Sequence, residues 1–311
     1  MRTIPALHSP LKPPLCLCLL LVIFILGCHG VGEFSFNDNK SKPVSNNNAD
    51  WMARLNDNML LSDVLIPGTH DTMALHGGPL AKCQAWKLED QLKAGVRYLD
   101  LRVFNFFSSD AGKLFIVHGI IYQHKRFEDV VNKVNDFLKQ HPQETVLMRV
   151  KPEHFKKGKV NDLLDDYMNK KKISVWVNKE IPKMNQVRGK IVFLQKEPFT
   201  LGIPLTSTDQ QNDYVVKKIE DKKNKIKDHI NEAAEGRCSE KVYLIYSSGT
   251  GKCKNFKTPK TIAREINPWL TQHLDKIPSE EHKCVGVIAM DFPGEELISR
   301  IINLNFIGNQ N

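Results

Sequence analysis

The chain lacks several features that would point to particular classes of protein. Its seven cysteines include no Cys-x-x-Cys pair, which argues against a zinc site of the kind built from closely spaced thiolates. Beyond residue 50 there is no long linker, internal repeat or low-complexity block, and no nucleic-acid-binding motif occurs. With 311 residues and 41% hydrophobic content, the chain is long enough for one large domain with a full core.

A long hydrophobic run is missing as well. The apolar stretch from Leu15 to Leu26 has about a dozen residues, whereas a membrane-spanning helix needs about 20. Arg2 and Lys12 precede it, and small residues follow up to Gly30. This pattern predicts a secretory signal peptide over residues 1–30, so we expect a secreted protein. The alternative is a retained signal anchor.

What remains after residue 30 is basic and begins with a polar segment. The formal net charge of +9 falls by two without Arg2 and Lys12, and such a charge suits an anionic membrane surface or a polyanionic glycan. Outside the cell, nucleic acid is not an expected partner. Residues 31–50 are rich in asparagine and carry a glycosylation sequon at Asn39. We expect a flexible polar leader there and a single domain over residues 51–311.

Short apolar segments alternate with amphipathic ones along this domain. Such alternation predicts a parallel α/β architecture, most simply an irregular (β/α)8 TIM-type barrel. The expected strands are Val64–Ile66, Tyr98–Phe104, Leu114–Val117, Thr145–Val150, Lys190–Leu194, Val242–Ser247 and Val285–Met290. The expected helices are Lys87–Ala94, Phe127–Gln140, Val160–Asn169, Val216–Ala234, Thr261–Leu274 and Glu295–Ile302.

Polar residues stand at the ends of these strands. In such barrels reactive side chains lie at the carboxyl ends of the strands, and His70, Arg102, His118, Lys151 and Asp291 fall there. Two imidazoles can take one proton and give another near neutral pH, which points to general acid–base chemistry without a covalent nucleophile.

Four cysteines remain after residue 30, enough for two disulfides. Cys238 and Cys284 each precede an expected strand, and Cys83 and Cys253 each follow one. The two ends of a strand are farther apart than the roughly 7 Å between Cα atoms that a disulfide allows. We therefore expect the pairs Cys238–Cys284 and Cys83–Cys253, the alternative being free, buried cysteines.

Six motifs in register resemble the catalytic X domain of the phosphatidylinositol-specific phospholipases C. They occupy residues 67–72 (PGTHDT), 95–102 (GVRYLDLR), 117–119 (VHG), 144–151 (ETVLMRVK), 188–194 (RGKIVFL) and 287–292 (VIAMDF). The resemblance therefore covers nearly all of the chain beyond the leader.

The resemblance implies a role for each of five residues. His70 resembles the general base that takes the proton of the inositol 2-hydroxyl, and His118 resembles the general acid that protonates the diacylglycerol oxygen. Asp291 resembles the carboxylate that orients the base, and Asp71 resembles the partner of the acid. Arg102 resembles the arginine that takes the place of calcium in the bacterial-type branch. The calcium-dependent branch has an asparagine where Asp71 stands, so we expect no metal and no cofactor.

Four further residues are similar to the family's inositol-binding positions. Lys151 resembles a residue that contacts the inositol hydroxyls, Lys196 stands where the family carries an arginine, and Tyr214 resembles the aromatic floor under the ring. The family's Asp-x-Tyr becomes Asn-Asp-Tyr at residues 212–214, so either Asn212 or Asp213 holds the hydroxyl-binding place.

Together these residues predict a monomeric, secreted phospholipase C. Its expected partners are a phospholipid membrane, met transiently, and the head group of phosphatidylinositol or of glycosylated phosphatidylinositol anchors. The expected products are diacylglycerol and inositol 1,2-cyclic phosphate. Two alternatives stay open: a non-catalytic protein that binds inositol lipids or glycans on the same barrel, and a phosphodiesterase acting on another phospholipid.

Overall fold

A sheet of mainly parallel strands forms the centre of the fold. The computed structural model describes residues 34–105, 113–153, 157–195, 201–204, 213–235, 241–251, 257–277 and 284–307. Across the sheet the parallel strands are β6 (Val175–Trp176), β7 (Ile191–Gln195), β5 (Val146–Pro152), β2 (Tyr98–Phe104), β1 (Ile66–Thr69), β10 (Val287–Met290) and β9 (Leu244–Tyr246).

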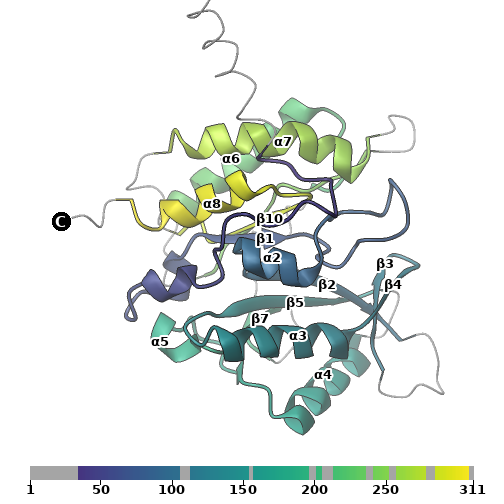
Figure 1. Ribbon diagram of the computed structural model, residues 1–311, viewed down its shortest axis with the longest axis vertical. Coiled ribbons are helices and arrows are strands. Elements are labelled where there is room, and N and C mark those ends of the chain that lie inside the picture. Colours follow the sequence, from purple (N-terminus) through teal and green to yellow (C-terminus); the bar gives the residue numbers. More distant parts are fainter. Residues whose placement is uncertain are drawn as a thin grey trace, which may run out of the picture.

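Helices cover the outside of this sheet. Figure 1 shows α6, α7 and α8 on one side of the strands and α3 and α4 on the other. The helices are α2 (Leu88–Ala94), α3 (Phe127–Gln140), α4 (Lys157–Lys171), α5 (Met184–Val187), α6 (Ile219–Glu235), α7 (Pro259–Leu274) and α8 (Glu295–Leu304), with short 3-10 helices at Trp51–Arg54 and Leu61–Asp63.

The sheet is curled into an open barrel. The Tyr98 hydroxyl on β2 lies 3.2 Å from the Tyr246 hydroxyl on β9, although two strands separate β2 from β9 in the sheet. Among the described residues, no strand pairing joins β9 to β6, β7 or β8 (Ile203–Pro204), so the barrel stays open on that side. The expectation of an irregular α/β barrel is confirmed.

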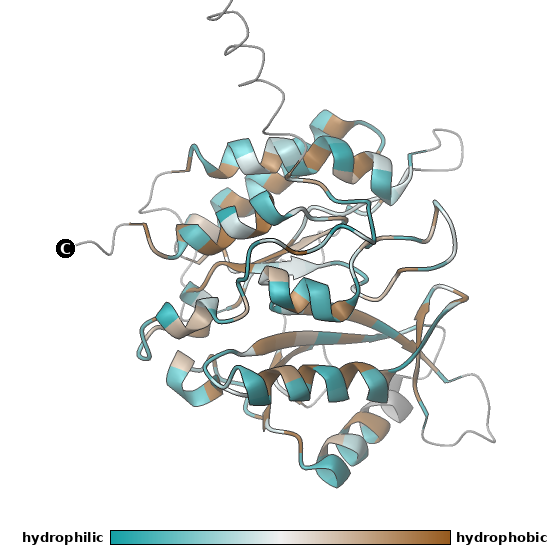
Figure 2. Ribbon diagram, in the orientation of Figure 1, coloured by the Kyte–Doolittle hydropathy of each residue, from teal (hydrophilic) through white to brown (hydrophobic). Residues whose placement is uncertain are grey.

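The hydrophobic pattern explains why these segments fold as they do. In α3, Phe127, Val130, Val131, Val134 and Leu138 are buried on one face while charged residues face solvent. Figure 2 shows the same two-sided pattern on the helices and more uniformly hydrophobic central strands. All four residues of β1 and of β10 are buried, as expected for parallel strands covered on both faces.

One strand runs in a direction that the sequence did not indicate. β3 (Phe115–His118) pairs with β2 in antiparallel fashion and forms a hairpin with β4 (Ile121–Arg126). With seven residues, β2 is longer than the four-residue β1, so its end provides a free edge on which β3 returns. His118 thus lies at the end of an antiparallel strand, not at the end of a parallel one.

The segment expected to be a flexible leader is folded where the structure describes it. Phe36 forms a β-bridge with Pro293, the Ser35 hydroxyl donates to Glu296 at 2.7 Å, and Val44 is buried in the core. The Asn39 side chain is exposed, and its Oδ1 accepts a hydrogen bond from the Ser41 amide at 2.9 Å. Residues 1–33, which include the expected signal peptide, lie outside the described residues.

The expected pairing of Cys83 with Cys253 is wrong. Cys83 is a free, buried thiol that lies 4.0 Å from Nδ1 of His118, because the loop carrying it folds inward behind the strand ends. Cys284 is disulfide-bonded. Cys238 and Cys253 lie outside the described residues, so the pairing of Cys284 with Cys238 stays a prediction. Within the described part of the chain, no helix is both long and apolar enough to cross a membrane.

A buried ion pair fastens the folded N-terminal segment to the barrel. The guanidinium of Arg97 donates to Glu144 Oε2 through Nε and Nη2, both at 2.8 Å. Its Nη2 also donates to the carbonyls of Asn48 and Ala49 at 3.2 and 2.7 Å. Neither charged side chain has any solvent exposure, so each charge depends on the other.

We expect Glu144→Gln to lower the free energy of unfolding by about 3–5 kcal/mol, because it leaves the Arg97 charge buried without its counter-ion. Urea unfolding followed by circular dichroism measures the change. The matched control is Asp166→Asn, which breaks an exposed pair with Lys170 and is expected to cost at most about 0.5 kcal/mol. Equal losses in the two variants would contradict the role given to the buried pair.

Candidate active site

The candidate site lies at the carboxyl ends of four neighbouring strands. His70 and Asp71 follow β1, Asp291 follows β10, Arg102 lies near the end of β2, and Lys151 lies opposite Arg102 on β5. Because β5, β2, β1 and β10 are adjacent in the sheet, these side chains meet although they are up to 221 residues apart. The side chain of Gln84 donates to the carbonyls of His70 and Met290 at 2.7 and 2.9 Å and so ties two strand ends together.

His70 is held at both ring nitrogens. Its Nδ1 lies 2.9 Å from Asp291 Oδ1, and its Nε2 lies 3.0 Å from Nη2 of Arg102. A guanidinium only donates hydrogen bonds, so Nε2 is the acceptor and the proton of the neutral ring is on Nδ1, where it is donated to Asp291. This tautomer leaves Nε2 as the atom that can take a proton.

The charges around His70 favour its protonated form. Burial lowers the pKa of the imidazole, but the carboxylates of Asp71 and Asp291 outweigh burial and raise the pKa above its usual value. An imidazole with a raised pKa holds a proton more firmly, and the Asp291 carboxylate at Nδ1 stabilises the imidazolium form of the ring.

Asp71 lies at the centre of the site. Its Oδ2 is 3.4 Å from Nε2 of His70 and 3.4 Å from Nε2 of His118, and its Oδ1 pairs with Nε of Arg102. The two imidazoles therefore point at one carboxylate oxygen. His118 is in turn fixed by its Nδ1, which donates to the carbonyl of Ala81 at 2.6 Å, so its Nε2 faces the site.

Arg102 is a fixed positive charge in this cluster. Burial lowers its pKa, yet the carboxylates of Asp71, Asp100 and Glu153 outweigh burial and raise the pKa further. Its Nη1 donates to Glu153 Oε1 at 3.0 Å. The guanidinium remains charged at every relevant pH and can hold the oxygens of a phosphate as negative charge develops on them.

The structure adds residues that the sequence did not single out. Asp100 is buried within 4.8 Å of His70 and Asp71, measured between possible ligand atoms. Glu153 pairs with Arg102 as described above, and the ring of Tyr246 meets that of His70 edge-on at 5.9 Å. Asp100 and Arg102 are two residues apart on one strand and therefore lie on the same face of the sheet. This spacing could have identified Asp100 from the sequence as a neighbour of Arg102.

The four expected substrate-binding residues differ in where the structure puts them. Lys151 is half-buried beside Arg102. Burial lowers the pKa of Lys151, and the nearby Asp100 carboxylate offsets part of this shift by raising it. The Tyr214 ring lies 5.5 Å from that of His70. The Asp213 carboxylate pairs with Lys225 of α6 at 2.5 Å and is half-exposed. Lys196 and Asn212 lie outside the described residues.

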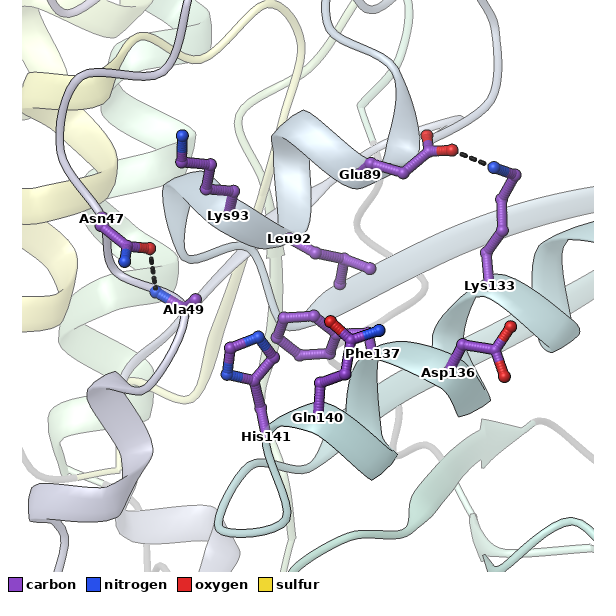
Figure 3. Close-up of a pocket in the computed structure, with 10 residues that line it drawn as sticks. All are labelled: Asn47, Ala49, Glu89, Leu92, Lys93, Lys133, Asp136, Phe137, Gln140 and His141. Atoms are coloured by element: carbon purple, nitrogen blue, oxygen red, sulfur yellow. Dashed lines mark hydrogen bonds and ion pairs between the residues drawn. The ribbon is translucent and has the colours of Figure 1, made fainter.

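A separate hollow of about 410 Å³ lies between α2 and α3. Figure 3 shows Leu92 and Phe137 at its floor, with His141 and Lys93 at its rim. His141 and Lys93 precede β5 and β2 in the chain, so this hollow is toward the opposite end of the strands from His70, and neither histidine of the candidate site lines it.

The site geometry indicates a class of enzyme. An α/β barrel whose strand ends bring together two histidines, a carboxylate partner for each and a fixed cation is suited to acid–base cleavage of a phosphodiester. The family model "Phosphatidylinositol-specific phospholipase C, X domain" matches residues 58–197.

Relatives match over most of the chain. It is 30% identical to the 1-phosphatidylinositol phosphodiesterase of Listeria monocytogenes, over 94% of this chain and 96% of that protein. The corresponding enzyme of Staphylococcus aureus strain Newman is 22% identical, over 85% of this chain and 96% of that protein. The chain belongs to the phosphatidylinositol-specific phospholipase C family and is homologous to 1-phosphatidylinositol phosphodiesterases.

Solved structures agree with the fold. The phosphatidylinositol-specific phospholipase C of Listeria monocytogenes superposes with a TM-score of 0.73 at 28% identity and covers 83% of this chain and 99% of that one. A Staphylococcus aureus structure concerned with modulation of membrane binding gives a TM-score of 0.71 at 19% identity, over 85% of this chain and 99% of that one.

We expect Asp291→Asn to lower the pKa of His70, because it removes one of the two carboxylates that raise that pKa. NMR titration of the histidine ring protons measures the shift. Asp50→Asn is the matched control, since Asp50 accepts from the surface residue His141 at 2.7 Å and is not among the charges that shift the pKa of His70. A His70 titration that moves equally in both variants would contradict the assigned contact.

Proposed function

We propose that this protein is a secreted phospholipase C that cleaves phosphatidylinositol, or its glycosylated derivatives, into diacylglycerol and inositol 1,2-cyclic phosphate. The observation that carries the proposal is the shared carboxylate of Asp71, at which His70, His118 and Arg102 converge. The similarity to the Listeria enzyme over 94% of the chain supports the substrate class. Secretion rests on the pattern of residues 1–30.

In the proposed first step, Nε2 of His70 takes the proton of the inositol 2-hydroxyl. The hydroxyl oxygen then forms a bond to phosphorus. In the free protein Nε2 accepts from Arg102, so the substrate hydroxyl replaces that contact, and the guanidinium is released to the non-bridging phosphate oxygens. Asp291 stabilises the resulting imidazolium through Nδ1.

The bond from phosphorus to the glycerol oxygen breaks as His118 gives that oxygen a proton. The donated proton is on Nε2, because Nδ1 is committed to the carbonyl of Ala81. Asp71 Oδ2 lies 3.4 Å from the same Nε2. The proposal needs no metal ion, since Arg102 supplies the positive charge beside the phosphate.

The departure at residues 212–214 bears on the head group more than on the reaction. Asp213 is engaged with Lys225, whereas Tyr214 lies beside His70. An assay of phosphatidylinositol, a glycosylated anchor and a sphingophospholipid, with and without a calcium chelator, tests the substrate and the cofactor together. Cleavage restricted to the sphingophospholipid, or lost with the chelator, would overturn the proposal.

We expect His70→Ala and His118→Ala each to lower the rate of phosphatidylinositol cleavage by about 10²–10⁴-fold. The two variants differ on a water-soluble inositol phosphate ester whose leaving group is acidic and departs without a proton. On that ester His118→Ala regains most of its rate, while His70→Ala stays slow. The reverse pattern would exchange the two roles, and full activity of either variant would sink the mechanism.

Exposed apolar side chains flank the site. Leu80 is 69% exposed and Ile120 is 85% exposed. The loops that carry them are in contact. The Ala81 carbonyl accepts a hydrogen bond from His118. Gly77 packs so closely against Ile121 that a Cβ added to Gly77 would lie 2.8 Å from the Ile121 side chain. We propose that these two residues insert into the membrane when the site meets its lipid.

We expect Ile120→Asp to lower the rate on phosphatidylinositol vesicles by about tenfold or more, because burying an isoleucine contributes about 1.5–3 kcal/mol. The rate on water-soluble inositol cyclic phosphate is expected to stay unchanged. Ile307→Asp is the matched control, being 45% exposed at the opposite end of the barrel. Equal losses in both variants, or equal losses on both substrates, would refute membrane insertion.

A further inference from the structure

The free thiol of Cys83 lies directly behind the two histidines. It has no solvent exposure and is 4.0 Å from Nδ1 of His118. The backbone holds it there: the Cys83 amide donates to Ala74, and its carbonyl accepts from the Phe292 amide, both at 2.9 Å. The proposed reaction does not use this thiol.

Cys83 belongs to two groups of metal-ligating side chains. One possible ligand atom from each of Asp71, Cys83 and His118 lies within 4.8 Å of the other two, and the same holds for His70, Cys83 and Asp291. The sulfur is common to both groups. It therefore lies within 4.8 Å of a carboxylate oxygen of Asp71 and of one of Asp291.

We propose that Asp71, Cys83 and His118 bind a thiophilic divalent cation such as Zn²⁺, and that this cation inhibits the enzyme. Thiolate, imidazole and carboxylate are the ligands that zinc prefers. Ligands at zinc bond lengths are roughly 3.3–3.7 Å apart in a tetrahedral site, and His118 Nε2 and Asp71 Oδ2 are already 3.4 Å apart.

The second contact of His118 fits this role. Metal-bound histidines usually donate their other N–H to a carbonyl or carboxylate, and Nδ1 of His118 donates to Ala81 at 2.6 Å. Its Nε2 is therefore presented to the site with the ring already oriented. Of the three side chains, His118 is the most exposed, at 11%, and it provides the entry for an ion from solvent.

Binding of the cation exchanges the thiol proton of Cys83 for the metal ion. Cys83 is a free thiol before the ion binds. The S–H bond breaks, the proton goes to solvent, and the sulfur forms a bond to the metal. Once the metal holds Nε2 of His118, that atom can no longer protonate a leaving group.

The direct test uses Co²⁺ as a spectroscopic probe on the whole protein. We expect a thiolate-to-cobalt absorption band in the near ultraviolet that Zn²⁺ abolishes by displacement and that Cys83→Ser lacks. This readout does not depend on the proposed phospholipase activity. Absence of the band in the unaltered protein would overturn the proposal, whatever the variants do.

The functional test rests on the proposed function and measures phosphatidylinositol cleavage over a range of Zn²⁺ concentrations. Each variant is compared with its own rate in chelator. We expect Cys83→Ser and Cys83→Ala to raise the concentration for half-inhibition by at least about tenfold. Mg²⁺ at equal concentration is expected to have no effect, because it prefers oxygen ligands.

His124→Asn is the control for adventitious binding, since the rings of His76 and His124 are 4.8 Å apart and offer zinc a second pair of nitrogens. Inhibition that survives in Cys83→Ser and disappears in His124→Asn would overturn the assignment to Cys83. A protein that gives the cobalt band but cleaves no lipid would retain the metal site and lose the proposed function.

Discussion

The ion pair between Asp71 and Arg102 is the interaction on which the rest of the site depends. Asp71 is almost fully buried, and a buried carboxylate is costly unless a positive charge or hydrogen-bond donors satisfy it. With Oδ1 taken by Arg102, Oδ2 is left to face both imidazoles. The backbone at Asp71 has a φ of +40°, a region that aspartate enters more readily than most residues, and this turn brings the carboxylate back over the strand end.

Charged residues of β2 and β5 lie opposite one another near this ion pair. In the register between β2 and β5, Asp100 lies opposite Arg149, whereas Arg102 lies opposite Lys151. The first pair is of opposite sign and compensates a buried carboxylate. The second places two cations side by side at the end of the strands, which is unfavourable unless an anion lies near them. Asp71 and Glu153 supply such anions, because both pair with the guanidinium of Arg102.

The sequence predicted the architecture well because burial leaves a regular pattern. The bounds of β2 and α3 agree to the residue with the expected ones, and the remaining expected helices differ by a few residues at their ends. The places of His70, Asp71 and Asp291 directly after β1 and β10 agree with the expected strand ends, whereas the roles given to these residues stay predictions. The antiparallel direction of β3 was not foreseeable, because a four-residue apolar run carries no information about which neighbour it pairs with or in which direction.

The contacts of Cys83 could not be predicted from the sequence. Its place after a strand correctly put it at the same end of the barrel as the histidines, but that end gathers loops from many parts of the chain, and spacing along the chain does not say which of them touch. The thiol faces His118 instead of another cysteine.

The contacts of Asp71 also determine which cations the site can bind. Calcium needs six or more oxygen ligands, and Arg102 already occupies one oxygen of Asp71 and one of Glu153. A cation that accepts three or four ligands, one of them sulfur, requires only the side of Asp71 that Arg102 leaves open. The guanidinium that takes the place of a hard metal ion in the proposed reaction therefore does not protect the site against a thiophilic one.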